Sequence, residues 1–508
     1  NRALEISEAL LAESDTPKNQ RELTFCLNRV GDVHRDLTQP HKALEYFNRA
    51  LEISEALLAE SDTPKNQREL TFCLNRVGDV HRDLTQPHKA LEYFNRALEI
   101  SEALLAESDT PKNQSELTSM LSRMGSLYRE LNQLEKTLDC YHRELDVRKA
   151  LTESSVSLQD KRNLSGCFYR IAEAYQDLSQ PEKALKFYQQ DLEINEKLLE
   201  TEDTPFNRRA LTYALIRIGD AYRDLGQPHD SLDHYQKSLD IREDLLKSSD
   251  SPLNQSLVVI SIDRIGDAYR DLSQSGKALE LLQQSLTMRE ALLEENDTPF
   301  NRRELTYTLI RIGDAYRDLG QPYDSLDHYQ QTLDIREDLL KSSDSPLNQR
   351  LVVISIDRIG DAYRDLGQPG KAIELFQRSL TGGEAILEKN DTPFNRRELT
   401  YTLIRIGDAY RDLSQPYDAL DHYQQTLDIR EDLLKSFNLP LSQKLVAISL
   451  DRIGDTYRGL GQPYDSFDYY QQALDIREDL LKSSDLPLNR KLVAISLDRI
   501  GDAYIGIS

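Results

Sequence analysis

A seven-residue string, most often Arg-Ile-Gly-Asp-Ala-Tyr-Arg, returns along the chain with its glycine every 47 residues, or after 94 where Ala172 takes the glycine's place. The repeat glycines are Gly31, Gly78, Gly125, Gly219, Gly266, Gly313, Gly360, Gly407, Gly454 and Gly501. A strict period of this length indicates one supersecondary unit stacked on copies of itself. Eleven registers fit into the 508 residues. We therefore expect function to lie on long surfaces rather than in a single pocket.

Each unit reads as two antiparallel helices. In residues 204–250, Thr204 followed by Pro205 is typical of a helix start. An apolar stripe with helical spacing follows, at Leu211, Leu215, Ile218, Tyr222 and Leu225. Gly226-Gln227-Pro228 ends this helix and opens a second, which we expect to run to about Lys247 with Leu232, Tyr235, Leu239 and Leu246 buried. Because glycine weakens a helix interior, Gly219 predicts a close backbone approach to a neighbouring helix.

These residues also carry a resemblance to a known family. Ile218-Gly219, Tyr222, Gly226 and Tyr235 resemble the tetratricopeptide repeat signature, and the pattern covers essentially the whole chain. The unit is longer than the standard repeat of this family and resembles the long-helix subclass of kinesin light chains and multi-copy bacterial repeat proteins. The family's proline near the end of the second helix is replaced by Glu243, so we expect that helix to run on. The resemblance implies an all-α fold, an α-solenoid forming a right-handed superhelix of about eleven helix-turn-helix units.

Composition restricts the function classes. The net charge is −24, and residues 301–347 alone contribute −3, so the acidity belongs to the repeat. Such a surface disfavours nucleic acid and anionic membranes and favours basic or mixed protein partners. The four cysteines show no CxxC spacing, and no apolar stretch approaches the ~18 residues of a membrane span. These features predict a cytoplasmic protein without a metal site or cofactor.

Motifs for catalysis are absent from the sequence. It contains no GxxxxGK[ST], HExxH or GxSxG string, so we predict a protein that is not an enzyme. His34 and His81 stand where other copies have Tyr222 or Tyr316, which favours a packing role.

The resemblance places ligand contacts on the first helix of each unit, which in this family lines the concave surface. Positions six and three before the glycine, and one, four and five after it, share that face. The candidate peptide-binding residues are Tyr213, Asp220, Arg223, Asp224, Asp263, Asp267, Arg270, Tyr307, Asp314, Arg317, Asp318, Asp357, Asp361, Arg364, Tyr401, Asp408 and Arg411. They predict an acidic groove for a peptide with basic side chains. The alternative is that Asp and Arg three apart on one helix form solvent-facing ion pairs, each worth only ~0.2–0.5 kcal/mol.

The copies fall into three segments. Residues 1–114 are near-identical repeats, residues 115–206 are two irregular repeats, and residues 207–508 alternate with a true period of 94. We expect one continuous solenoid that is a piece of a longer chain. The irregular copies are expected to interrupt the acidic ladder, and Gly382-Gly383 is a candidate hinge within a helix.

Three functional hypotheses remain open from the sequence. The first is a protein–protein interaction scaffold that binds a peptide or protein segment in the acidic concave groove. The second is a sensor or regulatory arm of a larger bacterial effector, such as an NTPase or protease, in which case an effector domain would be attached. The third is a structural solenoid that self-associates end to end.

Overall fold

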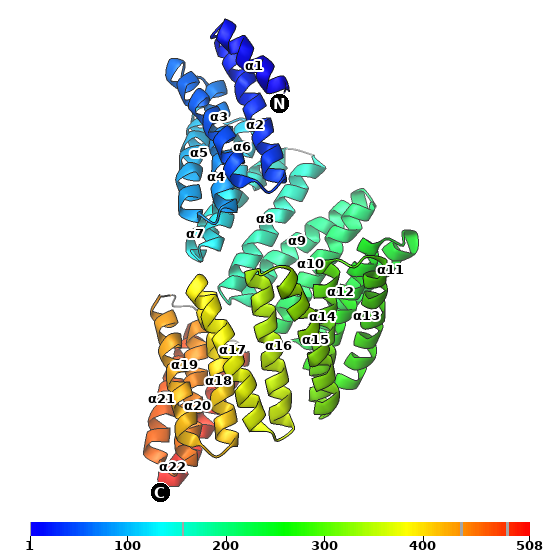
Figure 1. Ribbon diagram of the computed structural model, residues 1–508, viewed down its shortest axis with the longest axis vertical. Coiled ribbons are helices and arrows are strands. Elements are labelled where there is room, and N and C mark those ends of the chain that lie inside the picture. The colour runs from blue at the N-terminus through cyan, green and yellow to red at the C-terminus, as the bar shows by residue number, and fades with distance from the viewer. Residues whose placement is uncertain (1, 155–156, 437–439, 484–486, 508) are drawn as a thin grey trace. The chain divides into compact units, whose positions relative to one another are not determined.

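The computed structural model describes residues 2–154, 157–436, 440–483 and 487–507, and all the regular elements in these ranges are α-helices (Figure 1). In chain order they are α1 (Arg2–Glu13), α2 (Pro17–Asp36), α3 (Pro40–Glu60), α4 (Pro64–Asp83), α5 (Pro87–Glu107), α6 (Pro111–Glu130), α7 (Leu134–Ser154), α8 (Leu158–Asp177), α9 (Pro181–Thr201), α10 (Pro205–Asp224), α11 (Pro228–Ser248), α12 (Pro252–Asp271), α13 (Ser275–Glu295), α14 (Pro299–Asp318), α15 (Pro322–Ser342), α16 (Pro346–Asp365), α17 (Pro369–Lys389), α18 (Pro393–Asp412), α19 (Pro416–Ser436), α20 (Pro440–Gly459), α21 (Pro463–Ser483) and α22 (Pro487–Ile507). From α2 onward, even-numbered helices are the first helices of the repeats, and odd-numbered helices are the second helices.

The chain forms two compact units. Unit one comprises Asn1–Asp177 and Lys186–Thr201, and unit two comprises Leu178–Leu185 and Glu202–Ser508. Within each unit, consecutive helices pack as antiparallel pairs, and the pairs stack. First helices also contact the next first helix directly, as α10 does α12 and α12 does α14, so they form the inner layer of the stack. The predicted all-α repeat architecture is confirmed, whereas the three sequence segments remain a prediction.

Helix boundaries follow from local signals that recur in most copies. The Thr204 side chain caps α10 by accepting a hydrogen bond of 3.2 Å from the backbone N–H of Asn207. Pro205 fills the first helical position, where its missing N–H costs nothing. Gly226 follows the end of α10 with a φ of +69°, a left-handed conformation that favours glycine. The second helix α11 continues to Ser248, which confirms that Glu243 does not end it.

The core is a series of local clusters. One such cluster in unit two joins α11 to α12 through Tyr235, Leu239, Val258, Ile262 and Ile265. Each helix pair therefore buries its apolar face against its neighbours, as a solenoid requires. In the part of the chain described, no helix has the length and apolar character needed to cross a membrane.

The repeat glycine makes room for a ring rather than for a backbone. A Cβ placed on Gly313 would lie 2.4 Å from Cε1 of Tyr329, the aromatic residue on the second helix of the same repeat. At Gly266 the opposing side chain is Leu282, with its Cγ at 2.9 Å. The expected close approach of backbones is therefore wrong in detail, because the space is filled by a side chain of the paired helix.

Two further expectations concern packing. Tyr222 and His234 place their ring centroids 5.3 Å apart, and His34 and Tyr46 form the same contact with the residue types exchanged. The packing role of His34 is confirmed. Helix α17 runs unbroken through Gly382 and Gly383, so the hinge expected there does not interrupt the helix.

Candidate functional site

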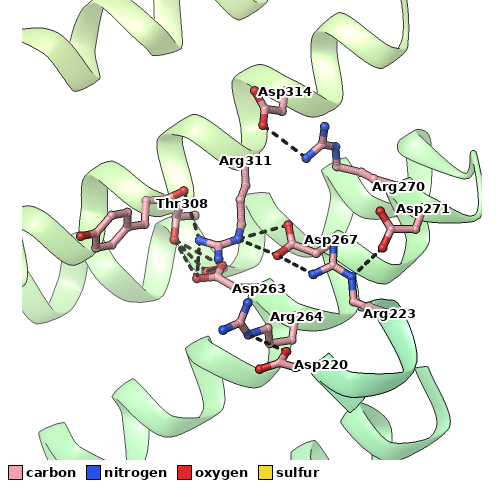
Figure 2. A network of polar contacts seen from close by, with 12 residues as sticks. Asp220, Arg223, Asp263, Arg264, Asp267, Arg270, Asp271, Thr308, Arg311 and Asp314 are labelled. Atoms are coloured by element: carbon pink, nitrogen blue, oxygen red, sulfur yellow. Dashed lines mark hydrogen bonds and ion pairs between the residues drawn. The ribbon is translucent and has the colours of Figure 1, made fainter. Parts of the chain in front are cut away.

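Four aspartates of unit two lie between arginines of neighbouring repeats. Asp314, the residue after its repeat glycine, pairs with Arg270 of the preceding repeat at 3.4 Å and with Arg358 of the following repeat at 3.5 Å. It also accepts a hydrogen bond of 2.6 Å from the Tyr329 hydroxyl. Figure 2 shows the corresponding pairs around Asp267. We call these four the zipper aspartates: Asp267, Asp314, Asp361 and Asp408.

The arginine four residues after the repeat glycine also pairs with a second aspartate of the following repeat, which lies five residues after that repeat's own glycine. Arg270 donates to Asp318 at 2.7 Å, and Arg317 donates to Asp365 at 2.6 Å. These acceptors lie five residues after their own glycines, and their side chains stay 38–40% exposed. We call them the rim aspartates: Asp271, Asp318, Asp365 and Asp412.

The pairs therefore join repeats, 44 or 48 residues apart, instead of joining neighbours on one helix. Burial disfavours the charged form of Arg270, but its hydrogen bond to Asp318 and the charge of Asp314 outweigh that effect, and the pKa of the guanidinium is raised. Since the zipper carboxylates are largely buried and paired on both sides, they hold the first helices in register. The solvent-facing pairs along one helix, the alternative from the sequence, are the minor pattern here.

A glycine on α20 interrupts this pattern. Where a rim aspartate is expected on α20, the residue is Gly459. Arg411 of the preceding repeat then approaches Asp408 of its own helix at 3.8 Å.

Unit one keeps its own version of the inter-repeat pairs. Arg35 pairs with Asp83 at 2.5 Å, and Arg82 pairs with Glu130. Arg129 of the first irregular repeat contacts Glu173 at 3.2 Å and Asp177 at 2.5 Å. The expected interruption of the acidic ladder at 115–206 is therefore only partial. Glu130 and Glu173 replace aspartates and keep the contact with arginine, whereas Ser126 and Gln176 replace an aspartate and an arginine of the ladder.

The structure separates the predicted site residues by depth. Tyr213 is 51% exposed, Asp224 is also exposed, and Tyr307 and Tyr401 are half-buried. The inter-repeat pairs include Asp220, Arg223, Asp267, Arg270, Asp314, Arg317, Asp318, Asp361, Arg364 and Asp408. Arg411 instead pairs with Asp408 of its own helix.

Asp263 and Asp357 are only 3% and 6% exposed. The expectation that these two lie on an open face is wrong in this structure, because a residue three before the glycine turns toward the second helix.

A buried arginine on the second helix is the feature that sequence reasoning missed. It occupies one fixed place in the repeat, at Arg242, Arg289, Arg336, Arg430 and Arg477, each at most 4% exposed. The signal was present in the sequence, because Tyr329, Leu333, Arg336 and Leu339 have the spacing of one buried stripe. We call this position the interior position.

The interior arginine has two kinds of surroundings. Arg336 donates to Thr306 Oγ1 at 3.0 Å, to the Leu351 carbonyl at 3.0 Å and to Ser355 Oγ at 2.9 Å, with its guanidinium 5.5 Å from the ring centre of Tyr307. Burial lowers the pKa of Arg336 to about 10. None of these acceptors is a carboxylate. Arg242 and Arg430 have the same type of partners.

In the alternate repeats the interior arginine is paired with acid. Arg289 places Nη2 3.0 Å from Asp263 Oδ2 and Nη1 3.1 Å from Glu304 Oε2, and donates from Nε to Thr308 at 2.8 Å. Arg477 forms the equivalent pair with Asp451 at 2.5 Å. The 94-residue alternation therefore has a chemical meaning, because the aspartate that pairs with arginine alternates with an isoleucine such as Ile310.

Two buried cysteines have thiols that burial keeps protonated. Burial raises the pKa of the Cys167 thiol to about 12 and that of Cys140 to about 11, which disfavours the nucleophilic thiolate. No cluster of three or more His, Cys, Asp or Glu residues suited to a metal ion occurs within the ranges described.

Comparison with known proteins identifies the family. Tetratricopeptide repeat models match residues 23–103, 164–244, 210–291, 305–347, 355–381 and 398–479, which is more than half of the chain. The chain belongs to the tetratricopeptide repeat family. Comparison with curated proteins gives no match.

Solved structures with a similar fold share little sequence with the chain. The apo form of RapI is 14% identical, with a TM-score of 0.51, and the match covers 81% of this chain and 99% of RapI. A Rap protein complexed with Competence and Sporulation Factor is 15% identical, with a TM-score of 0.45, over 80% of this chain and 99% of that one. Nearly identical repeats of a kinesin light chain from Podosopora anserina are 20% identical, with a TM-score of 0.35, over 47% of this chain and 100% of theirs. The match to RapI supports a common fold and no more.

Proposed function

We propose that this protein is a non-enzymatic interaction scaffold whose first helices in unit two bind a peptide or protein segment with basic side chains. Tetratricopeptide repeat proteins generally bind proteins or peptides, and the chain belongs to that family. The proposal adds the surface, the charge of the ligand and the residues that contact it.

The rim aspartates carry the proposal. Each zipper aspartate is neutralised by two guanidinium groups, so the zipper attracts a cationic ligand weakly. Each rim aspartate has one arginine behind it and keeps about two fifths of its side chain open. Rim residues recur once per repeat from α12 to α18, near the C-terminal ends of the first helices of the inner layer. Tyr307 and Tyr401 lie on two of the same helices, 11 residues before Asp318 and Asp412. A row of partly exposed carboxylates suits lysine and arginine side chains.

The experiment compares two triple variants with equal changes of charge. The inner-layer triple is Asp318→Asn, Asp365→Asn and Asp412→Asn. The control triple is Asp240→Asn, Asp334→Asn and Asp428→Asn, which are exposed positions on the second helices. Asparagine keeps an acceptor for the arginine behind it, so both triples are expected to fold. Substituting Asp314, Asp361 and Asp408 would instead break the zipper and confuse stability with binding.

Binding is measured by fluorescence anisotropy with a panel of labelled cationic peptides and scrambled acidic counterparts. We expect the inner-layer triple to weaken the affinity for the best cationic peptide by about tenfold, or ~1.4 kcal/mol. The control triple should change that affinity by no more than about twofold. Affinity of the unmodified chain should fall as salt rises. An equal loss of affinity in both triples, or an affinity that does not change with salt concentration, would contradict the proposal.

A further inference from the structure

The repeat formed by α16 and α17 lacks the interior arginine. It keeps the residues that surround this arginine in the repeat 94 residues earlier, formed by α12 and α13, which we call the sister repeat. The interior position is Gly383, one 94-residue period after Arg289. Asp357, Glu398 and Thr402 stand where the sister repeat has Asp263, Glu304 and Thr308, the three residues that hold the Arg289 guanidinium. Figure 2 shows two of them, Asp263 and Thr308, in the sister repeat.

A cavity of about 360 Å³ lies at this point between α16, α17 and α18. Its lining includes Gly383, Asp357, Glu398 and Thr402, together with Tyr401, one of the half-buried tyrosines of the inner layer. The volume falls in the ~300–1,000 Å³ range of small-ligand pockets. The cavity therefore combines the acceptors of a guanidinium site with the space of a missing arginine side chain.

Asp357 is the polar group that this substitution leaves short of partners. It is 6% exposed, and its Oδ1 accepts no hydrogen bond from the described residues. Oδ2 accepts one from Thr402 at 2.9 Å and lies 3.5 Å from Arg405 Nη1. Burial raises the pKa of Asp357, although Arg405 and the nearby Ser379 hydroxyl oppose that shift. A buried carboxylate with one oxygen that accepts no hydrogen bond costs free energy of folding. It therefore favours binding of a hydrogen-bond donor in the cavity.

Three arginines also line the cavity, and each has another contact. Arg405 pairs with Asp361 at 3.2 Å, and Arg358 pairs with Asp314 at 3.5 Å. Their counterparts make the same pairs in the sister repeat, where the site does hold a guanidinium. Those two arginines are therefore compatible with a further guanidinium.

The third arginine is specific to this repeat. Arg350, which replaces Ser256, lies over the ring of Phe394, with its guanidinium carbon 4.9 Å from the ring centre.

We propose that the Gly383 cavity binds a guanidinium group, supplied by an arginine side chain or by a small alkylguanidinium. The ligand would repeat the contacts of Arg289. One N–H edge of the guanidinium would face Asp357, another would face Glu398, and a further N–H would donate to Thr402. A primary ammonium is a poorer fit, because it cannot present the planar fork that bridges two carboxylates. The site is separate from the rim aspartates and does not depend on the proposed function.

Calorimetric titration of the full chain tests the proposal with agmatine, with acetyl-Gly-Arg-Gly-amide and with putrescine as the ammonium control. We expect saturable one-site binding of at least one guanidinium probe, and at least tenfold weaker binding of putrescine. Agmatine alone would indicate a small-molecule site, whereas binding of the peptide indicates a site for arginine side chains. No saturable binding of either guanidinium probe overturns the proposal.

Variants locate the binding. Gly383→Arg supplies the missing side chain, so we expect it to abolish probe binding and to raise the melting temperature. Its Cβ would meet a methyl of Leu399 at 3.0 Å, which that flexible side chain can relieve. Asp357→Asn, which keeps the shape of the site, should weaken binding at least tenfold. The matched control is Gly370→Arg on the same helix, where a Cβ meets nothing within 4 Å. Unchanged binding in Gly383→Arg and Asp357→Asn would overturn the assignment.

Discussion

At the interior position, five repeats of unit two place a buried arginine between neighbouring helices, and Gly383 is the exception. Arg336 and Arg289 occupy equivalent positions there, yet only Arg289 meets carboxylates. A cation removed from water is costly unless it is paired, so the two arginines contribute differently to stability although both are buried.

Replacing the two arginines by methionine measures this difference. Arg289→Met leaves Asp263 buried without its main counter-charge, and we expect a loss of ~3–5 kcal/mol in local stability. Arg336→Met removes hydrogen bonds to neutral acceptors and leaves no carboxylate behind, so the loss should stay near ~1–2 kcal/mol. Native-state hydrogen exchange in α13 and α15 checks the order. Equal losses would show that the carboxylates around Arg289 do not matter.

The same residues show where sequence reasoning reached its limit. The spacing on its own helix places Asp263 on the open face. That spacing contains no information about Arg289, the residue of the second helix that pairs with it. Arg289 was overlooked because arginine is usually exposed, although its place in an apolar stripe gave the signal. Burial of this pair could not be derived from either helix alone.

At the scale of the helix, an asparagine in the first turn of most first helices also bonds to the end of the previous second helix. Asn254 in α12 donates from Nδ2 to the carbonyl oxygens of Leu245, at 3.1 Å, and Ser249, at 2.8 Å. Its backbone N–H donates to the capping Ser251 hydroxyl at 3.3 Å. These bonds give a further donor to two carbonyl groups at the end of α11, which also accept from the backbone N–H groups of Ser249 and Ser251.

Removing this amide tests the role of the turn. Asn254 is 1% exposed, and Asn254→Ala removes its two side-chain hydrogen bonds to the end of α11. We therefore expect a loss of ~1–3 kcal/mol in the stability of α11 and α12. The control is Gln255→Ala, which loses one exposed hydrogen bond to Asp250.

As a surface substitution, the control should cost at most about 0.5 kcal/mol. Urea denaturation followed by circular dichroism compares the two variants. A control as costly as Asn254→Ala would show that the amide has no special role.

Among the features of the individual helices, the boundaries could be predicted from the sequence. Thr-Pro or Ser-Pro at the start, and Gly-Gln-Pro or Ser-Gln-Pro at the turn, fix the ends within a residue or two in most copies. The side chains that cross between repeats were not predictable in this way, because their partners are 44 or 48 residues away and depend on how the repeats stack.

At the scale of the molecule, each unit is a stack whose inner layer is joined by ion pairs. The 47-residue period predicted the stack, and the family models agree with it. The charge pattern predicted an acidic face. Only the structure divides that charge into zipper aspartates, which bind neighbouring repeats, and rim aspartates, which keep part of their surface open.

Hydrogen exchange with mass spectrometry, with and without the best cationic peptide of the panel, tests the central proposal most directly. If the ligand lies along the inner layer of unit two, protection should appear on α12, α14, α16 and α18 and should leave the outward faces of α13, α15 and α17 unchanged. The inner-layer triple of asparagines should lose this protection. Protection confined to the second helices, or retained in full by that triple, would contradict the account.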